Sequence, residues 1–117
     1  MHASIFYITE EQIDSSQRLH EDYVYGMLEP VVGLDYVDEV PNISDPDMKD
    51  DLQVCLPYDS CLRGSRLILG NKRLTRMSGG DMIVVTSKNT WEYFENWIKS
   101  LNPKKTYFLN QWYDYHI

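Results

Sequence analysis

The chain has 117 residues, of which 43% are hydrophobic and 25% charged, and its formal net charge is −7. A chain of this length buries about two-thirds of its unfolded surface when it folds, so stability requires neither a metal nor a disulfide. We therefore predict a single domain over residues 1–117. The net charge argues against unaided binding to nucleic-acid phosphates or anionic membranes, and it favours a basic partner.

The charge is divided along the sequence. Residues 1–54 hold thirteen acidic and two basic residues, a net charge of −11, whereas residues 55–117 hold five acidic and nine basic residues, a net charge of +4. The densest acidic segment is 35–51, and the densest basic segment is 62–76. This asymmetry biases which partners the protein meets, but it does not identify a reaction.

The first predicted elements are a strand over 3–8, rich in β-branched and aromatic residues, and a helix over about 10–28. Thr9 and Gln12 have the spacing of a capping box, which places the start of the helix. Pro30 is expected to end it, because the residue before a proline avoids helical geometry.

The acidic segment is predicted to be mainly a solvated loop, since it holds few apolar residues. Within it, 36–40 has the composition of a short strand. Asp45-Pro46 has the pattern of an N-cap followed by proline at the first helical position, which predicts one helical turn over 47–52.

Short strands are expected next, bounded by glycine, proline and polar turns. They are 52–56, 66–69, 72–77 and 82–86. Gly70-Asn71 is a two-residue hairpin signal, which predicts that 66–69 pairs with 72–77. In that register Leu67, Leu69 and Leu74 face inward, and Arg66 and Arg73 face outward.

The last predicted elements are a helix over 90–101, begun by Asn89, and a strand over 105–113. The order of elements predicts an α+β fold with an antiparallel or mixed sheet of about five strands and two helices on one face. A split βαβ (ferredoxin-like) arrangement with extra strands satisfies that order.

No motif indicates catalysis or a cofactor. Cys55 and Cys61 lack both the following arginine of a phosphate-binding cysteine loop and the partners of a zinc site, so we expect two buried or half-buried thiols. Two of the three histidines are terminal, and His20 is expected to pack on the apolar face of the first helix. We therefore predict a protein that is not an enzyme and that holds no metal.

The N-terminus lacks the basic and apolar regions of a signal peptide, and no segment is long and apolar enough to span a bilayer. A cytoplasmic location is the resulting expectation, with both cysteines reduced.

The leading hypothesis is a non-enzymatic binding module that caps a basic partner, such as a nuclease or a defence effector, in the manner of immunity or phage anti-defence proteins. Clustered carboxylates would speed the encounter, and tyrosine or tryptophan anchors would supply affinity. The predicted partner-binding residues are Asp35, Tyr36, Asp38, Glu39, Asp45, Asp47, Asp50 and Asp51.

The alternative is a nucleic-acid or nucleotide binder that uses the basic segment. Its predicted contact residues are Arg63, Arg66, Lys72, Arg73 and Arg76. The acidic half opposes this hypothesis if the two segments lie together, because opposite charges then cancel over a Debye length of about 8 Å. A homodimer formed by pairing of an edge strand, such as the C-terminal one, is left open.

Overall fold

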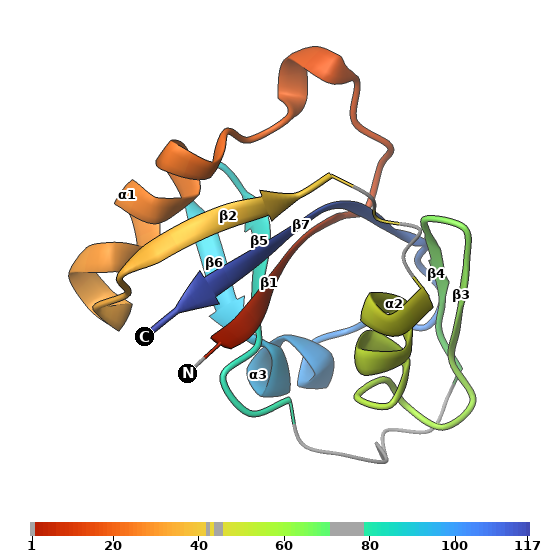
Figure 1. Cartoon of the computed structure of the whole chain (residues 1–117). Helices are drawn as coiled ribbons and strands as arrows, with labels where there is room; N and C mark the ends of the chain where they lie inside the picture. Colours follow the sequence, from red (N-terminus) through yellow and green to blue (C-terminus); the bar gives the residue numbers. More distant parts are fainter. Residues whose placement is uncertain (1, 42, 44–45, 71–78) are drawn as a thin grey trace.

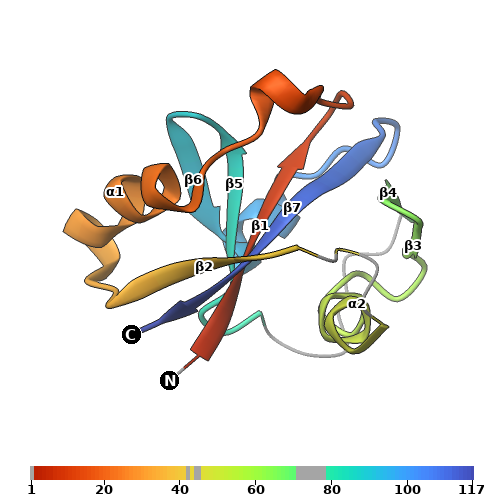
Figure 2. The ribbon, with the colours of Figure 1, turned by 45° about the horizontal axis from the view of Figure 1, so that its top comes forward.

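The computed structural model describes residues 2–41, 43, 46–70 and 79–117, and within these it leaves the side chains of residues 48 and 51 undescribed. Its elements form one mixed seven-stranded sheet with helices on both faces (Figures 1 and 2). The strands are β1 (His2–Thr9), β2 (Tyr36–Val40), β3 (Cys61–Arg63), β4 (Arg66–Ile68), β5 (Ile83–Ser87), β6 (Thr90–Tyr93) and β7 (Tyr107–His116). The helices are α1 (Glu21–Val32), α2 (Pro46–Gln53) and α3 (Phe94–Lys99), with a 3-10 turn at Ser15–Gln17. The predicted α+β class and the mixed sheet are confirmed, with more strands than expected.

The centre of the sheet is formed by β1 and β7, which pair antiparallel along nearly their whole lengths. On its other edge β1 pairs parallel with β5, and β5 continues into β6. The free edge of β7 is shared, since β4 pairs with its first residues and β2 with its last. Both β1 and β2 run antiparallel to β7, on its opposite edges, and α1 connects them.

Helices cover both faces of this sheet, so the prediction of two helices on one face is wrong. On one face Val24 and Leu28 of α1 pack against Tyr113 of β7. On the other face α3 and the end of α2 cover a second cluster around Phe6 and Trp112. A strand with apolar residues at consecutive positions presents them alternately to both faces, and both then need a cover.

Most aromatic side chains belong to these two clusters. Trp112, Tyr113 and Tyr115 are completely buried. The alternation of side chains along β7 is interrupted by a β-bulge. Tyr7 is opposite Gln111, whereas the next residue of β1, Ile8, is opposite Leu109. Asn110 is therefore the extra residue, and Gln111 lies on the face opposite Leu109, contrary to the predicted alternation.

The first helix begins eleven residues later than predicted, at Glu21. Asp14 caps a separate 3-10 turn, accepting from the backbone N–H of Ser16 at 2.9 Å, because aspartate and serine side chains compete for backbone groups in this segment. His20 is the N-cap of α1, and its Nδ1 accepts from the N–H of Asp22 at 3.1 Å, so His20 is exposed and not packed in the core.

The end of α1 also differs from the prediction. Pro30 lies within its last turn, and the helix ends instead at Gly33, which adopts a left-handed conformation with φ +69°. The N–H of Gly33 donates to the carbonyl of Glu29 at 2.9 Å, the bond that closes an αL cap. This glycine cap decides where the helix ends.

The acidic segment is largely ordered secondary structure and not a loop. The strand over 36–40 is confirmed as β2, and the predicted helical turn is α2, which begins at Pro46. Asp45, the predicted cap, lies outside the described residues. The predicted strand over 52–56 is wrong, because Leu52, Cys55 and Leu56 follow helical spacing and all three are buried in the core below α2.

The basic hairpin is formed by different residues from those predicted. β4 pairs with β3 through the turn Gly64-Ser65, where Gly64 has φ +60°, and with β7 on its other edge. Leu67 and Leu69 are buried and Arg66 is exposed, as predicted. The other predicted arm, 72–77, lies outside the described residues.

The region predicted as one helix over 90–101 divides into β6 and α3. Trp91 and Tyr93 suit an edge strand, and β6 pairs with β5 through a tight turn. The helix starts only at Phe94, and Phe94, Trp97 and Ile98 are buried.

No helix among the described residues is long and apolar enough to cross a membrane. The C-terminal strand lies inside the sheet, with both of its edges paired, so it is not available for the edge-to-edge dimer that we considered.

Candidate protein-binding surface

The end of the sheet where the chain starts and finishes carries an exposed polar surface, which we call the acidic sheet face. It consists of four exposed residues, His2, Asp35, Tyr36 and Asp38, and of two half-buried residues, Asp114 and His116. Figures 1 and 2 show the two chain ends side by side there, beside β2. His2, His116 and Tyr36 are directly opposite one another across three strands. In the next row Asp114 is opposite Asp38, so all these side chains project from one face.

Two histidine–aspartate pairs organise this surface. Nδ1 of His2 lies 3.1 Å from a carboxylate oxygen of Asp114, and Nδ1 of His116 lies 3.0 Å from Asp35. The two imidazole rings meet edge to face with their centroids 5.0 Å apart. Asp35 is held further by its backbone N–H, which donates to the carbonyl of His116 at 2.7 Å.

Tyr36 lies in the middle of the carboxylates. Its ring stacks on His116 with an interplanar angle of 6°, and its hydroxyl is 3.3 Å from Nδ1 of His2. Partial desolvation raises the pKa of Tyr36, and the charges of Asp114, Asp38 and Asp35 raise it further. The phenol therefore stays neutral at physiological pH and presents both an apolar ring and a hydroxyl.

The carboxylates of this surface have no arginine or lysine partner among the residues that the structure describes. Arg18 pairs with Glu39, and Lys105 pairs with Glu10, both away from this surface. Asp38 and Asp114 are like charges directly opposite each other in a sheet, an arrangement that is unfavourable unless a cation compensates it.

The structure separates the predicted partner-binding residues into three groups. Asp35, Tyr36 and Asp38 lie together on the acidic sheet face. Glu39 projects from the other face of β2, where its carboxylate accepts from Arg18 at 2.8 Å and from Gln111. The exposed residues Asp47 and Asp50, together with Asp51, belong to α2, and Asp45 lies outside the described residues.

Three residues of the surface were missed by the sequence analysis: His2, Asp114 and His116. Each is far in sequence from the acidic segment, and only the pairing of β1 with β7 and of β7 with β2 brings them together. Their spacing in the sequence contains a partial signal, since the polar residues at 114 and 116 alternate with buried Tyr113 and Tyr115, as expected for one exposed face of a strand.

The residues of the alternative hypothesis lie elsewhere in the fold. Arg63 and Arg66 are exposed and directly opposite each other across the β3–β4 hairpin. Lys72, Arg73 and Arg76 lie outside the described residues.

The described residues contain no group of three or more histidine, cysteine or acidic side chains arranged to hold a metal ion. Cys55 is buried, Cys61 is half-buried, and the two do not form a disulfide.

The chain matches no known family model, no curated protein and no solved structure.

Proposed function

We propose that this protein is a non-enzymatic binding module whose acidic sheet face caps a basic protein partner. The observation that carries the proposal is the set of three carboxylates, Asp35, Asp38 and Asp114, which are held on one face without an arginine or lysine partner among the described residues. A partner of the type of a nuclease or defence effector in the cytoplasm would supply the missing cations.

Two physical properties support a protein partner over a free cation. Tyr36 is 36% exposed, and its ring is held in place by stacking on His116. It therefore offers a rigid aromatic anchor that loses little side-chain conformational entropy on binding. The carboxylates lie on paired strands and not on a loop, so the surface is already formed before binding. Long-range attraction by these carboxylates would accelerate association at low ionic strength.

Affinity capture with charge-matched variants tests the proposal. The protein is immobilised and exposed to cell lysate at low salt, and the wild type is compared with Asp35→Asn/Asp38→Asn and with Asp47→Asn/Asp50→Asn on α2. We expect the wild type and the α2 variant to retain the same basic protein, released by salt, and the sheet-face variant to lose it. Loss from the α2 variant instead would move the binding surface to α2, and unchanged capture by the sheet-face variant would contradict the proposal.

A second candidate function rests on the β3–β4 hairpin. Arg63 and Arg66 are like charges at directly opposite positions, and a phosphate group between them would relieve their repulsion. A strand hairpin carrying arginines can contact a nucleic-acid backbone without reading its sequence.

Mobility-shift assays with single- and double-stranded oligonucleotides at low salt test this candidate. We expect a shift that disappears in Arg63→Ala/Arg66→Ala and remains in Lys88→Ala/Lys99→Ala, which removes the same charge elsewhere. Absence of any shift at low salt would eliminate the candidate.

A further inference from the structure

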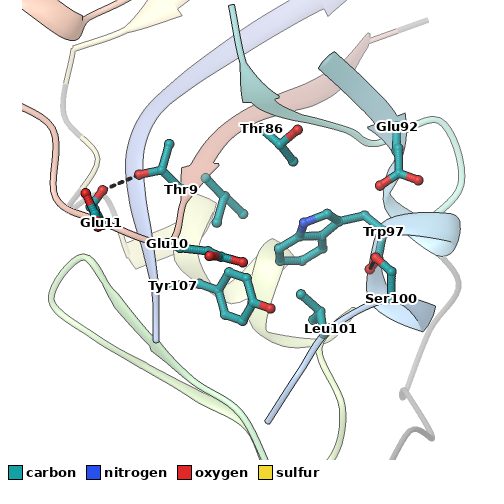
Figure 3. A pocket seen from close by; sticks show the side chains of 10 residues that line it. Thr9, Glu10, Glu11, Thr86, Glu92, Trp97, Ser100, Leu101 and Tyr107 are labelled. Atoms are coloured by element: carbon teal, nitrogen blue, oxygen red, sulfur yellow. Dashed lines mark hydrogen bonds between the residues drawn. The ribbon is translucent and has the colours of Figure 1, made fainter. Parts of the chain in front are cut away.

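A cavity of about 450 Å³ lies at the opposite end of β1 from the acidic sheet face (Figure 3). Its apolar wall is formed by Ile8, Leu101 and the rings of Trp97 and Tyr107, and its polar wall includes Glu10 and Glu92. These residues come from β1 and the segment after it, β6, α3 and the segment after it, and β7. The cavity is therefore built by distant parts of the chain and shares no residue with the acidic sheet face.

The indole of Trp97 supplies an unused hydrogen-bond donor to this cavity. Trp97 is only 3% exposed, and its ring is fixed by contacts with Phe94 and Tyr107, whose ring centroids lie 5.6 and 6.0 Å away. Figure 3 shows the indole nitrogen on the cavity side of the ring. No described residue accepts its N–H. The buried side-chain donor that has no partner among the described residues is Nε1 of Trp112, so the N–H of Trp97 is open to the cavity and free to bind a ligand there.

Glu92 supplies a carboxylate without a described cationic partner. It is half-buried on β6, opposite Val84, and Figure 3 shows its carboxylate directed towards the cavity. Glu10 differs, because Nζ of Lys105 binds it at 2.9 Å and the pKa of Lys105 is raised by that bond. The cavity thus combines an apolar wall, the indole N–H of Trp97, and the carboxylates of Glu92 and Glu11, which have no cationic partner among the described residues.

We propose that this cavity binds the α-ammonium end of an amino-acid amide or of a peptide N-terminus with an apolar first side chain. The ammonium donates to the carboxylate of Glu92, the adjacent carbonyl oxygen accepts from the indole N–H of Trp97, and the side chain packs on Ile8 and Leu101. A lysine side chain matches less well, because no acceptor is adjacent to its ammonium group.

The test is a titration of the full-length ¹⁵N-labelled protein with leucinamide, followed by NMR of the three tryptophan indole N–H signals. We expect a saturable shift confined to Trp97. 3-Methylbutylamine, which lacks the carbonyl, should bind about tenfold more weakly, the effect of losing one hydrogen bond. N-acetyl-leucinamide, which lacks the charge, should produce no saturable shift.

Variants and a peptide complete the test. Glu92→Gln should abolish the leucinamide shift, whereas Glu29→Gln, on α1 across the sheet, should retain it. Leu-Gly-Gly-amide distinguishes the two possible ligands, a peptide N-terminus and a free amino-acid amide. Binding as tight as that of leucinamide indicates a peptide N-terminus, and weaker binding indicates a free amino-acid derivative.

The proposal is overturned if Trp97 shows no saturable shift with leucinamide, if N-acetyl-leucinamide binds equally well, or if Glu92→Gln binds like the wild type. Asp38→Asn should leave leucinamide binding unchanged, so failure of this proposal and failure of the sheet-face proposal are distinguishable.

Discussion

The two faces of β2 treat their acidic residues in opposite ways. Glu39 faces α1 and belongs to a network with Arg18 and Gln111, so its charge is compensated within the molecule. Asp38 is its neighbour in sequence but projects from the other face, opposite Asp114 and beside Tyr36. On the face of β2 that is turned towards α1, which we call the internal face, the acidic residue stabilises the fold. On the exposed face, the acidic residues have no arginine or lysine partner among the described residues.

The largest expected effect concerns the internal face. Gln111 is 1% exposed; its amide oxygen accepts from the N–H of Leu19 at 2.7 Å, and its amide nitrogen donates to the carbonyl of Leu19 at 3.0 Å. Gln111→Ala leaves both backbone groups without this partner, and we expect a loss of about 2–4 kcal/mol in the free energy of unfolding. Urea denaturation measures it, with the exposed Gln12→Ala as the control. A loss as small as that of the control would show that the network does not stabilise the fold.

The next effect concerns pH. Burial raises the pKa of Tyr113 and of Tyr115 above their ordinary value of 10.0. A raised folded-state pKa means that the unfolded chain releases its protons first, so stability is complete below about pH 10 and falls as the pH rises above it. Each buried tyrosine contributes a slope of about 1.4 kcal/mol per pH unit in that range.

Urea denaturation between pH 9 and 11 on the wild type and on Tyr113→Phe checks this slope. The variant should lose stability more slowly with pH, although it starts lower because it lacks the hydrogen bond from the Tyr113 hydroxyl to the carbonyl of Leu19. Equal pH dependence of the free energy of unfolding in the wild type and in Tyr113→Phe would show that other titratable groups cause the loss of stability at alkaline pH.

The smallest expected effect concerns the exposed face. Asp38→Asn removes one of two like charges that oppose each other across β2 and β7, and we expect a gain of about 0.2–1 kcal/mol in the free energy of unfolding. Thermal denaturation at low salt measures the gain, with Asp47→Asn on α2 as the control. A loss of stability on Asp38→Asn would mean that this carboxylate has a compensating partner.

Sequence alone predicted the elements whose signals are local. The strand at 3–8, the strand at 36–40 and a helix in the region 90–101 are all present. Helix boundaries failed where two local signals competed: Asp14 and His20 capped separate elements, and the Gly33 cap outweighed Pro30. The sequence did not predict helices on both faces of the sheet. The buried residues of β1 and β7 belong to two hydrophobic clusters, one on each face, and each cluster is covered by a helix.

Half of the acidic sheet face was predicted, and the physical reason is the range of the interactions. Asp35, Tyr36 and Asp38 are close in sequence and were found from charge density alone. His2 and His116 are paired through a register between the first and last strands, which no local pattern specifies. Glu39 projects from the other face of β2, since successive residues of a strand face opposite sides; charge density alone does not distinguish the two sides.

The most direct test of the account compares Asp38→Asn with Glu39→Gln, two neighbouring substitutions that each remove one negative charge. The dissociation constant for the captured basic partner is measured by isothermal titration calorimetry at low salt. We expect Asp38→Asn to weaken binding about tenfold, and Glu39→Gln to leave binding unchanged while lowering stability by about 1 kcal/mol through loss of its ion pair with Arg18. Equal weakening by both substitutions, or weakening by Glu39→Gln alone, would contradict the assignment of the binding surface to the acidic sheet face.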